Sequence, residues 1–100
     1  MNNEENNMME LLRGVVDPEL MVNIVDLGLV YDIKYNEANR KIHVLLTLTS
    51  PGCPMGSIII DDAQHTLESC YPGNEVEIEL VWEPAWSVEM LSRQAKEELG

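Results

Sequence analysis

The sequence predicts an α+β fold: a two-layer α/β sandwich in which helices cover one face of a three-stranded sheet. Two segments, residues 29–35 and 42–48, carry apolar side chains at every second position. A third alternating segment covers residues 76–82. Segments with helical spacing precede, separate and follow these strands, so the predicted order is helix, strand, strand, helix, strand, helix.

All 100 residues are predicted to form a single domain. Its first helix is predicted from the apolar spacing of residues 8–16 and ends near Gly14, because a proline follows at position 18. The polar residues 1–7 are predicted to be a flexible tail. Residues 19–28 are predicted to form an ordered loop that leads into the first strand.

The first two strands are joined by residues 36–40, which have turn-forming chemistry and predict an antiparallel hairpin. A central helix follows from the apolar spacing between Met55 and Cys70, with Cys70 on its buried face. In the third strand, glutamates alternate with apolar residues, which predicts one buried face and one in water. The last helix is predicted to begin at Ser87, a good N-cap residue, and to end at Gly100.

The composition excludes several classes of partner. Eighteen acidic and six basic residues give a formal net charge of -12, and the basic residues are scattered along the chain. Nucleic acid and anionic membrane are therefore disfavoured as partners. No apolar run approaches the roughly 20 residues that span a bilayer, and the acidic N-terminus is unlike a signal peptide. We expect a cytoplasmic protein in which both cysteines stay reduced.

Cys53 is the leading candidate for chemistry. It lies in the segment TLTSPGCP (residues 47–54), between a predicted strand and a predicted helix. A helix start favours the thiolate, Gly52 lets another group approach the backbone, and Pro54 suits the first helical position. These features favour a reactive or metal-binding cysteine over a small apolar residue that fills a turn.

Two cysteines cannot supply a four-thiolate metal or cluster site within one chain. Other ligands or a second protomer must contribute. The loop acids Asp17, Glu19 and Asp26 are candidates, since carboxylate with thiolate suits zinc or iron. The alternative is structural: Asp17 would hydrogen-bond the turn at Pro18, and Asp26 would cap the bend that follows it.

The remaining candidates each have a structural alternative. Thr47 and Thr49 place hydroxyls beside Cys53, although threonine is also a good strand residue. Of Trp82 and Trp86, one is predicted to join the core, while the other covers the Cys53 region or lies at an interface. The two histidines, His43 and His65, are expected to face solvent.

Three motifs together resemble the MIP-eighteen/PaaD/SufT-like domain family, also called metal–sulfur cluster biosynthesis proteins. The motifs are DPELMVNIVDLGLV (residues 17–30), TLTSPGCP (residues 47–54) and WEPAWS (residues 82–87), continued by AKEELG at residues 95–100. The PaaD proteins carry an additional cysteine-rich C-terminal segment that this sequence lacks. The resemblance is therefore to a minimal, SufT-like bacterial member.

The resemblance implies an iron–sulfur cluster assembly domain-like fold and a role in cluster assembly or iron–sulfur protein maturation. It maps the family's reactive cysteine onto Cys53, which would be the metal ligand for a transient cluster or iron. Partners would be iron–sulfur client or assembly proteins, and a cluster that bridges two chains would make a homodimer. The supporting residues that the resemblance implies are Asp17, Glu19, Asp26, Thr47 and Thr49. Gly52 and Trp86 are further supporting candidates, from their positions beside Cys53 and in the third motif.

The leading hypothesis is thus a non-enzymatic accessory factor. A small thiol enzyme with Cys53 as nucleophile is an alternative, but neither histidine is obviously placed as its base. A second alternative is an acidic adaptor domain without thiol chemistry. The element order is also loosely like that of KH domains, but the required Gly-x-x-Gly loop is missing and the charge is wrong.

Overall fold

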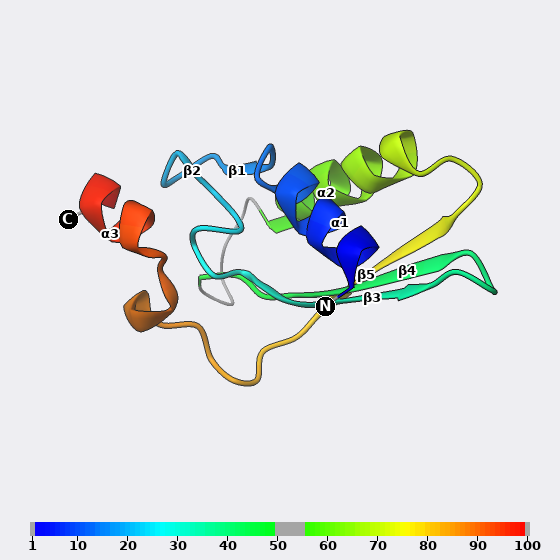
Figure 1. Ribbon diagram of the computed structural model, residues 1–100. Coiled ribbons are helices and arrows are strands. Elements are labelled where there is room, and N and C mark those ends of the chain that lie inside the picture. Colours follow the sequence, from blue (N-terminus) through cyan, green and yellow to red (C-terminus); the bar gives the residue numbers. More distant parts are fainter. Residues whose placement is uncertain (1, 50–55, 100) are drawn as a thin grey trace.

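The computed structural model describes residues 2–49 and 56–99. The helices are α1 (Asn3–Leu12), α2 (Gly56–Cys70) and α3 (Arg93–Leu99), and the main strands are β3 (Val30–Asn36), β4 (Lys41–Leu46) and β5 (Glu75–Leu80). Figure 1 shows α1 and α2 together on one face of the sheet, with its other face open. The two-layer α+β architecture is confirmed, while α3 lies beyond the end of the sheet rather than on it.

The main sheet has the strand order β3-β4-β5. The first pair is the predicted antiparallel hairpin, with an irregularity in register between Val30 and Asp32. The second pair is parallel, and α2 provides the connection between its strands. In β4 and β5 every second residue points to the helices, and the intervening glutamates of β5 face solvent as predicted.

The loop predicted over residues 19–28 contains one strand of a small second sheet and otherwise consists of turns. This sheet pairs β1 (Val16–Asp17) with β2 (Val22–Asn23), antiparallel. Met21 has a φ of 60° and its N–H donates to the Asp17 carbonyl (2.8 Å), which closes the turn. A strand of two residues is too short to show an alternating apolar pattern, so these strands cannot be predicted from the sequence.

The first helix begins at Asn3, earlier than predicted and within the segment expected to be a flexible tail. Asn2 is the N-cap: its Oδ1 accepts from Glu5 N (2.8 Å), and Glu5 Oε1 accepts from Asn2 N (3.0 Å). Glu5 Oε2 also accepts from Tyr35 N on β3 (2.9 Å). The hydrogen bonds from Tyr35 and Asn2 lower the pKa of Glu5. This capping box ties the start of α1 to the sheet.

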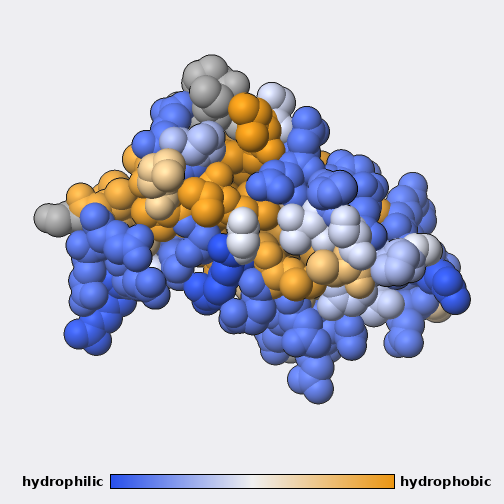
Figure 2. Space-filling view, turned by 90° about the horizontal axis from the view of Figure 1, so that it is seen from above, coloured by the Kyte–Doolittle hydropathy of each residue, from blue (hydrophilic) through white to orange (hydrophobic). Residues whose placement is uncertain are grey.

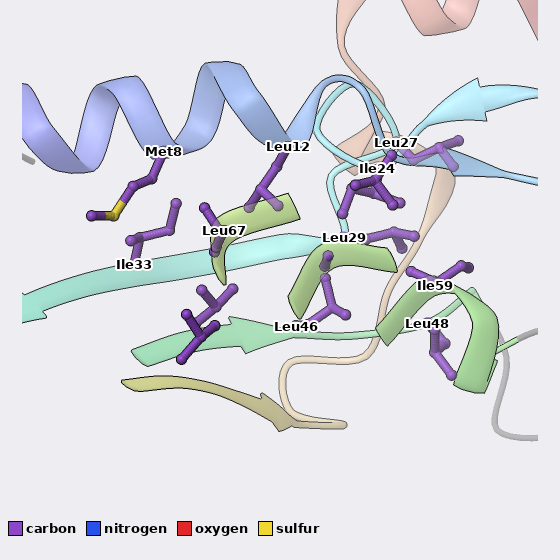
Figure 3. Packing of buried hydrophobic residues seen from close by; sticks show 14 of the residues in the cluster. Met8, Leu12, Ile24, Leu27, Leu29, Ile33, Leu46, Leu48, Ile59 and Leu67 are labelled. Atoms are coloured by element: carbon purple, nitrogen blue, oxygen red, sulfur yellow. The ribbon is translucent and has the colours of Figure 1, made fainter. Parts of the chain in front are cut away.

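The core lies between the two helices and the sheet. Figure 3 shows Met8 and Leu12 of α1 pointing toward Ile33 and Leu67, with Leu46 beneath them. The buried residues form one cluster that reaches Ala95 in α3: Met8, Leu12, Val15, Val22, Ile24, Leu27, Leu29, Ile33, Ile42, Val44, Leu46, Leu48, Ile59, Ala63, Leu67, Val76 and Ala95. None of the described helices is long and apolar enough to cross a bilayer.

The prediction that Cys70 is buried is wrong: Cys70 is exposed. The buried positions of α2 are Gly56, Ile59, Ala63 and Leu67, and the last three recur every four residues. Continuing that spacing leads to Tyr71, which packs against the core and beside Tyr35 (ring centroids 6.5 Å apart). Cys70 therefore lies one position off the apolar stripe.

The last helix begins later than predicted. A short 3-10 helix, η1 (Val88–Met90), follows Ser87, whose side chain makes no capping hydrogen bond there. The chain is extended again at Leu91, and α3 is capped instead by Ser92, whose Oγ accepts from Ala95 N (3.1 Å). Serine at either position fits a cap, so the sequence pattern alone did not separate them.

The loop between β2 and β3 is held by a network around Asp26. Its carboxylate accepts from Arg13 Nη1 (2.8 Å) and from Asn23 Nδ2 (2.7 Å), and Asn23 Oδ1 accepts from Asp26 N (2.9 Å). Hydrogen bonds from Asn23, and also from Arg13 and Ser92, lower the pKa of Asp26 against an opposing effect of burial. The network joins the end of α1 to this loop.

We predict that Asn2→Ala lowers the free energy of unfolding by about 1 kcal/mol, because α1 loses its N-cap. Asn7→Ala is the matched control, since Asn7 is an exposed residue inside the same helix. Urea unfolding should show little change or a slight gain for the control, as alanine is the better helix former. Equal losses in the two variants would contradict the capping role.

We predict that Asp26→Asn lowers stability at pH 7 by about 1–2 kcal/mol, because Arg13 loses its better-buried partner. The Arg13 side chain is 41% exposed, which keeps the loss below that of a fully buried pair. The folded pKa of Asp26 is lowered, so its contribution is complete above the unfolded pKa and is lost as pH falls through the folded pKa.

Urea unfolding between pH 7 and 3 provides the measurement. The difference between wild type and Asp26→Asn should be largest at pH 7 and shrink below about pH 4. Glu10→Gln is the control, because Glu10 pairs with the same Arg13 from an exposed position (Nε–Oε2 3.2 Å). Its effect should stay below about 0.5 kcal/mol. A pH-independent difference for Asp26→Asn would contradict the assignment.

Candidate functional site

The predicted centre of the site, Cys53 with Gly52, lies outside the described residues. The structure instead describes both flanks of this segment. Thr47, Leu48 and Thr49 follow β4, and Gly56 is the first residue of α2 in the described chain.

The two flanks pack directly against each other. A Cβ atom added to Gly56 would lie 2.5 Å from Leu48 Cδ1, closer than real contacts allow. Glycine therefore permits the start of α2 to pack against the end of β4. Leu48 and Gly56 are both buried. The chain on each side of the segment that carries Cys53 is therefore anchored in the core.

Thr47 is fully buried at the end of β4, where its N–H donates to the Leu29 carbonyl (2.8 Å). Its Oγ1 has no hydrogen-bond partner among the described residues. A buried hydroxyl without a partner carries a desolvation cost. Thr49 is half-buried.

The acidic residues of the first motif have mainly structural contacts. Asp17 is buried, and its Oδ1 accepts from Glu19 N (2.8 Å) and Leu20 N (3.2 Å). It thus stabilises the turn at Pro18, which is the structural alternative for this residue. Glu19 itself is exposed.

Asp26 is buried, but it does not cap the Leu27-Gly28 bend as its structural alternative predicts. Its carboxylate accepts instead from Arg13 and Asn23, which lie before it in the chain. Among residues 2–49 and 56–99, no group of three or more histidine, cysteine or acidic side chains is placed to hold a metal ion. Both buried loop carboxylates, Asp17 and Asp26, therefore accept hydrogen bonds from groups of the same chain.

The third motif packs onto the first. The Trp86 indole Nε1 donates to the Leu27 carbonyl (2.7 Å), and Tyr31 Oη donates to the Pro84 carbonyl (2.6 Å). A Cβ on Gly28, whose φ is 79°, would lie 2.4 Å from the Met90 carbonyl oxygen. Trp86 is the tryptophan that packs against the core, and Trp82 is 40% exposed.

Several residues that hold this region together were not predicted. Ser92 N donates to the Asp26 carbonyl (2.7 Å), so the start of α3 is joined to the same loop that Arg13 and Asn23 hold. The Asn23-x-x-Asp26 spacing is a usable signal, since asparagine commonly bonds backbone a few residues on. Arg13 carries no such signal, because its partner is distant in sequence.

This chain is similar in sequence to a known protein family and to several characterised proteins. A family model described as iron-sulfur cluster assembly protein matches residues 5–80. The Fe-S protein maturation auxiliary factor YitW of Bacillus subtilis is 45% identical over 94 residues, which cover 94% of this chain and 91% of that protein. The Fe-S protein maturation auxiliary factor SufT of Staphylococcus aureus is 44% identical, with 86% and 97% covered.

A solved structure supports the fold in the same way. The crystal structure of a domain of unknown function from Bacillus anthracis is 46% identical, covers 96% of this chain and is itself covered to 91%, with a TM-score of 0.91. The family resemblance of the three motifs is therefore confirmed in sequence and in fold. This chain belongs to the iron–sulfur cluster assembly protein family.

Proposed function

We propose that this protein is an accessory factor for iron–sulfur cluster assembly or iron–sulfur protein maturation, with Cys53 as the thiolate that holds or passes on its cargo. The observation that carries the proposal is the family match over residues 5–80, joined by relatives named as maturation auxiliary factors. This chain spans nearly their whole length. Those names describe auxiliary factors, which favours a carrier or assembly role over catalysis.

The chain offers a single thiolate at the proposed site. Cys70 ends α2, and 14 residues of helical rise separate it from Gly56 by about 21 Å. Cys70 therefore lies at the end of α2 that is far from Gly56, the flank of the Cys53 segment.

Carboxylate ligands from the first motif are also committed elsewhere. Asp17 and Asp26 accept hydrogen bonds from the chain's own donors. Freeing Asp26 for a metal would leave the Arg13 guanidinium without its better-buried partner. This arrangement supports a cargo whose coordination is completed by a second chain or by a client, and hence transient binding.

The strand end beside the site supports a role for Thr47. Its buried hydroxyl has no partner in the described part of the chain, and keeping such a group has a cost. We propose that Thr47 and Thr49 support the Cys53 segment by hydrogen bonding. The proposed location is the cytoplasm, where a free thiol stays reduced.

The thiol-enzyme alternative gains no support from the histidines. His43 points from β4 toward the open face of the sheet, where its Nε2 lies 2.8 Å from Glu79 Oε1. His65 is exposed in the third turn of α2, 3.5 Å from Ser69 Oγ. Both histidines are thus paired on surfaces away from the flanks Leu48 and Gly56.

We predict that Cys53→Ser abolishes iron–sulfur client maturation without loss of fold, because serine keeps the size of the side chain but removes the thiolate. In cells that lack the wild-type protein, the activity of iron–sulfur client enzymes provides the measurement. Anaerobic reconstitution with iron and sulfide, followed by visible absorption, measures cluster binding on the purified protein.

Cys70→Ser is the matched control, since Cys70 is the other cysteine of the chain and is exposed at the far end of α2. It should support maturation as well as wild type does. If Cys53→Ser also supports full maturation, the thiolate role is wrong and the acidic-adaptor alternative takes its place.

A further inference from the structure

An apolar groove opens at the end of the molecule that carries α3. It has a volume of about 440 Å³ and is lined by Leu20, Trp86, Val88, Leu91, Lys96 and Leu99. Figure 2 shows apolar surface running from the C-terminal end toward the middle of this face. Val88 is 64% exposed and Leu99 is 42% exposed, so two large apolar side chains at the groove are open to solvent.

The floor of this groove is fixed. Leu20, Trp86 and Leu91 pack against the core, and the Trp86 indole is held by its hydrogen bond to the Leu27 carbonyl. The backbone beside it is anchored by Ser92 N on the Asp26 carbonyl. A rigid apolar floor with exposed apolar walls is preformed for a ligand, because little ordering entropy remains to be lost on binding.

Charge decides what kind of occupant fits. The chain carries a net charge of -12, so a second copy of it would bring like charge against like charge. The wall-forming segment 88–99 has three glutamates against Arg93 and Lys96, and Arg93 is paired with Glu97 (Nε–Oε1 3.7 Å). A partner with basic residues around its apolar contacts is favoured over a copy of this chain.

We propose that this groove docks an amphipathic segment of a partner protein, in which apolar anchor residues are flanked by lysine or arginine. Apolar anchors at helical spacing would fill the groove between Val88, Leu91 and Leu99. The basic flanks would lie outside the groove lining, whose one charged residue is Lys96, and would face the three glutamates of segment 88–99. The proposal rests on the proposed function only in taking that partner to be an iron–sulfur client.

The test uses a synthetic peptide of about five helical turns, with leucines at i, i+3, i+4 and i+7 spacing and lysines elsewhere. The chain has two tryptophans, so Trp82→Phe leaves Trp86 in the groove as the reporter of binding. Titration should change Trp86 fluorescence saturably, and binding should weaken as salt is raised. An acidic peptide with the same leucines should bind at least tenfold more weakly.

Val88→Ser and Leu99→Ser should each weaken the lysine peptide by about five- to tenfold, because each removes an apolar wall of the groove. Ile58→Ser is the matched control: Ile58 is also an exposed apolar residue, on α2 outside the groove, and its variant should bind as wild type does. Cys53→Ser should also bind normally, which separates this test from that of the proposed function.

Four results would overturn the proposal. One is equal binding of the acidic and basic peptides, and another is equal weakening by Val88→Ser and Ile58→Ser. The third is sedimentation of the wild type as a dimer that Val88→Ser dissociates, which would make a second copy the occupant. The fourth is that the wild type does not bind the lysine peptide. If Cys53→Ser then still loses client maturation, the proposed function stands and the docking surface is disproved.

Discussion

The anchoring of Asp26 is the constraint on which the functional end of this fold depends. Its carboxylate joins the end of α1 to the loop before β3, and its carbonyl accepts from Ser92 at the start of α3. One residue therefore connects three parts of the chain that are far apart in sequence. Without it, the loop that supports Trp86 and lies against Thr47 would lose its fixed position.

This arrangement explains why the three motifs belong together although they are distant along the chain. Trp86 of the third motif donates to the Leu27 carbonyl of the first, and Ser92, which lies between the two parts of the third motif, donates to the Asp26 carbonyl. The end of β4 bonds the same loop through Leu29. The first motif thus works largely as a frame. Its buried acids hold the chain in shape, which leaves the thiolate chemistry to Cys53 and to whatever partner completes the coordination.

Much of the architecture is predictable because it depends on local periodicity. The alternation in β3, β4 and β5 and the apolar spacing of α2 identify these elements directly. The features that were not predicted depend on single residues or on distant contacts. They are the capping by Asn2 and Ser92, the two-residue strands of the small sheet, and the one-position offset that exposes Cys70. The Arg13–Asp26 pair could not be predicted, since nothing local indicates which cation meets a buried acid.

The capping residue Glu5 has a consequence for the behaviour of the protein at high concentration. Its carboxylate occupies Tyr35 N–H at the outer edge of β3, while the opposite edge strand, β5, carries Glu75, Glu77 and Glu79. One outer N–H of β3 is thus already bonded, and the other edge strand carries like charges. Both features oppose the joining of two copies of this chain edge to edge.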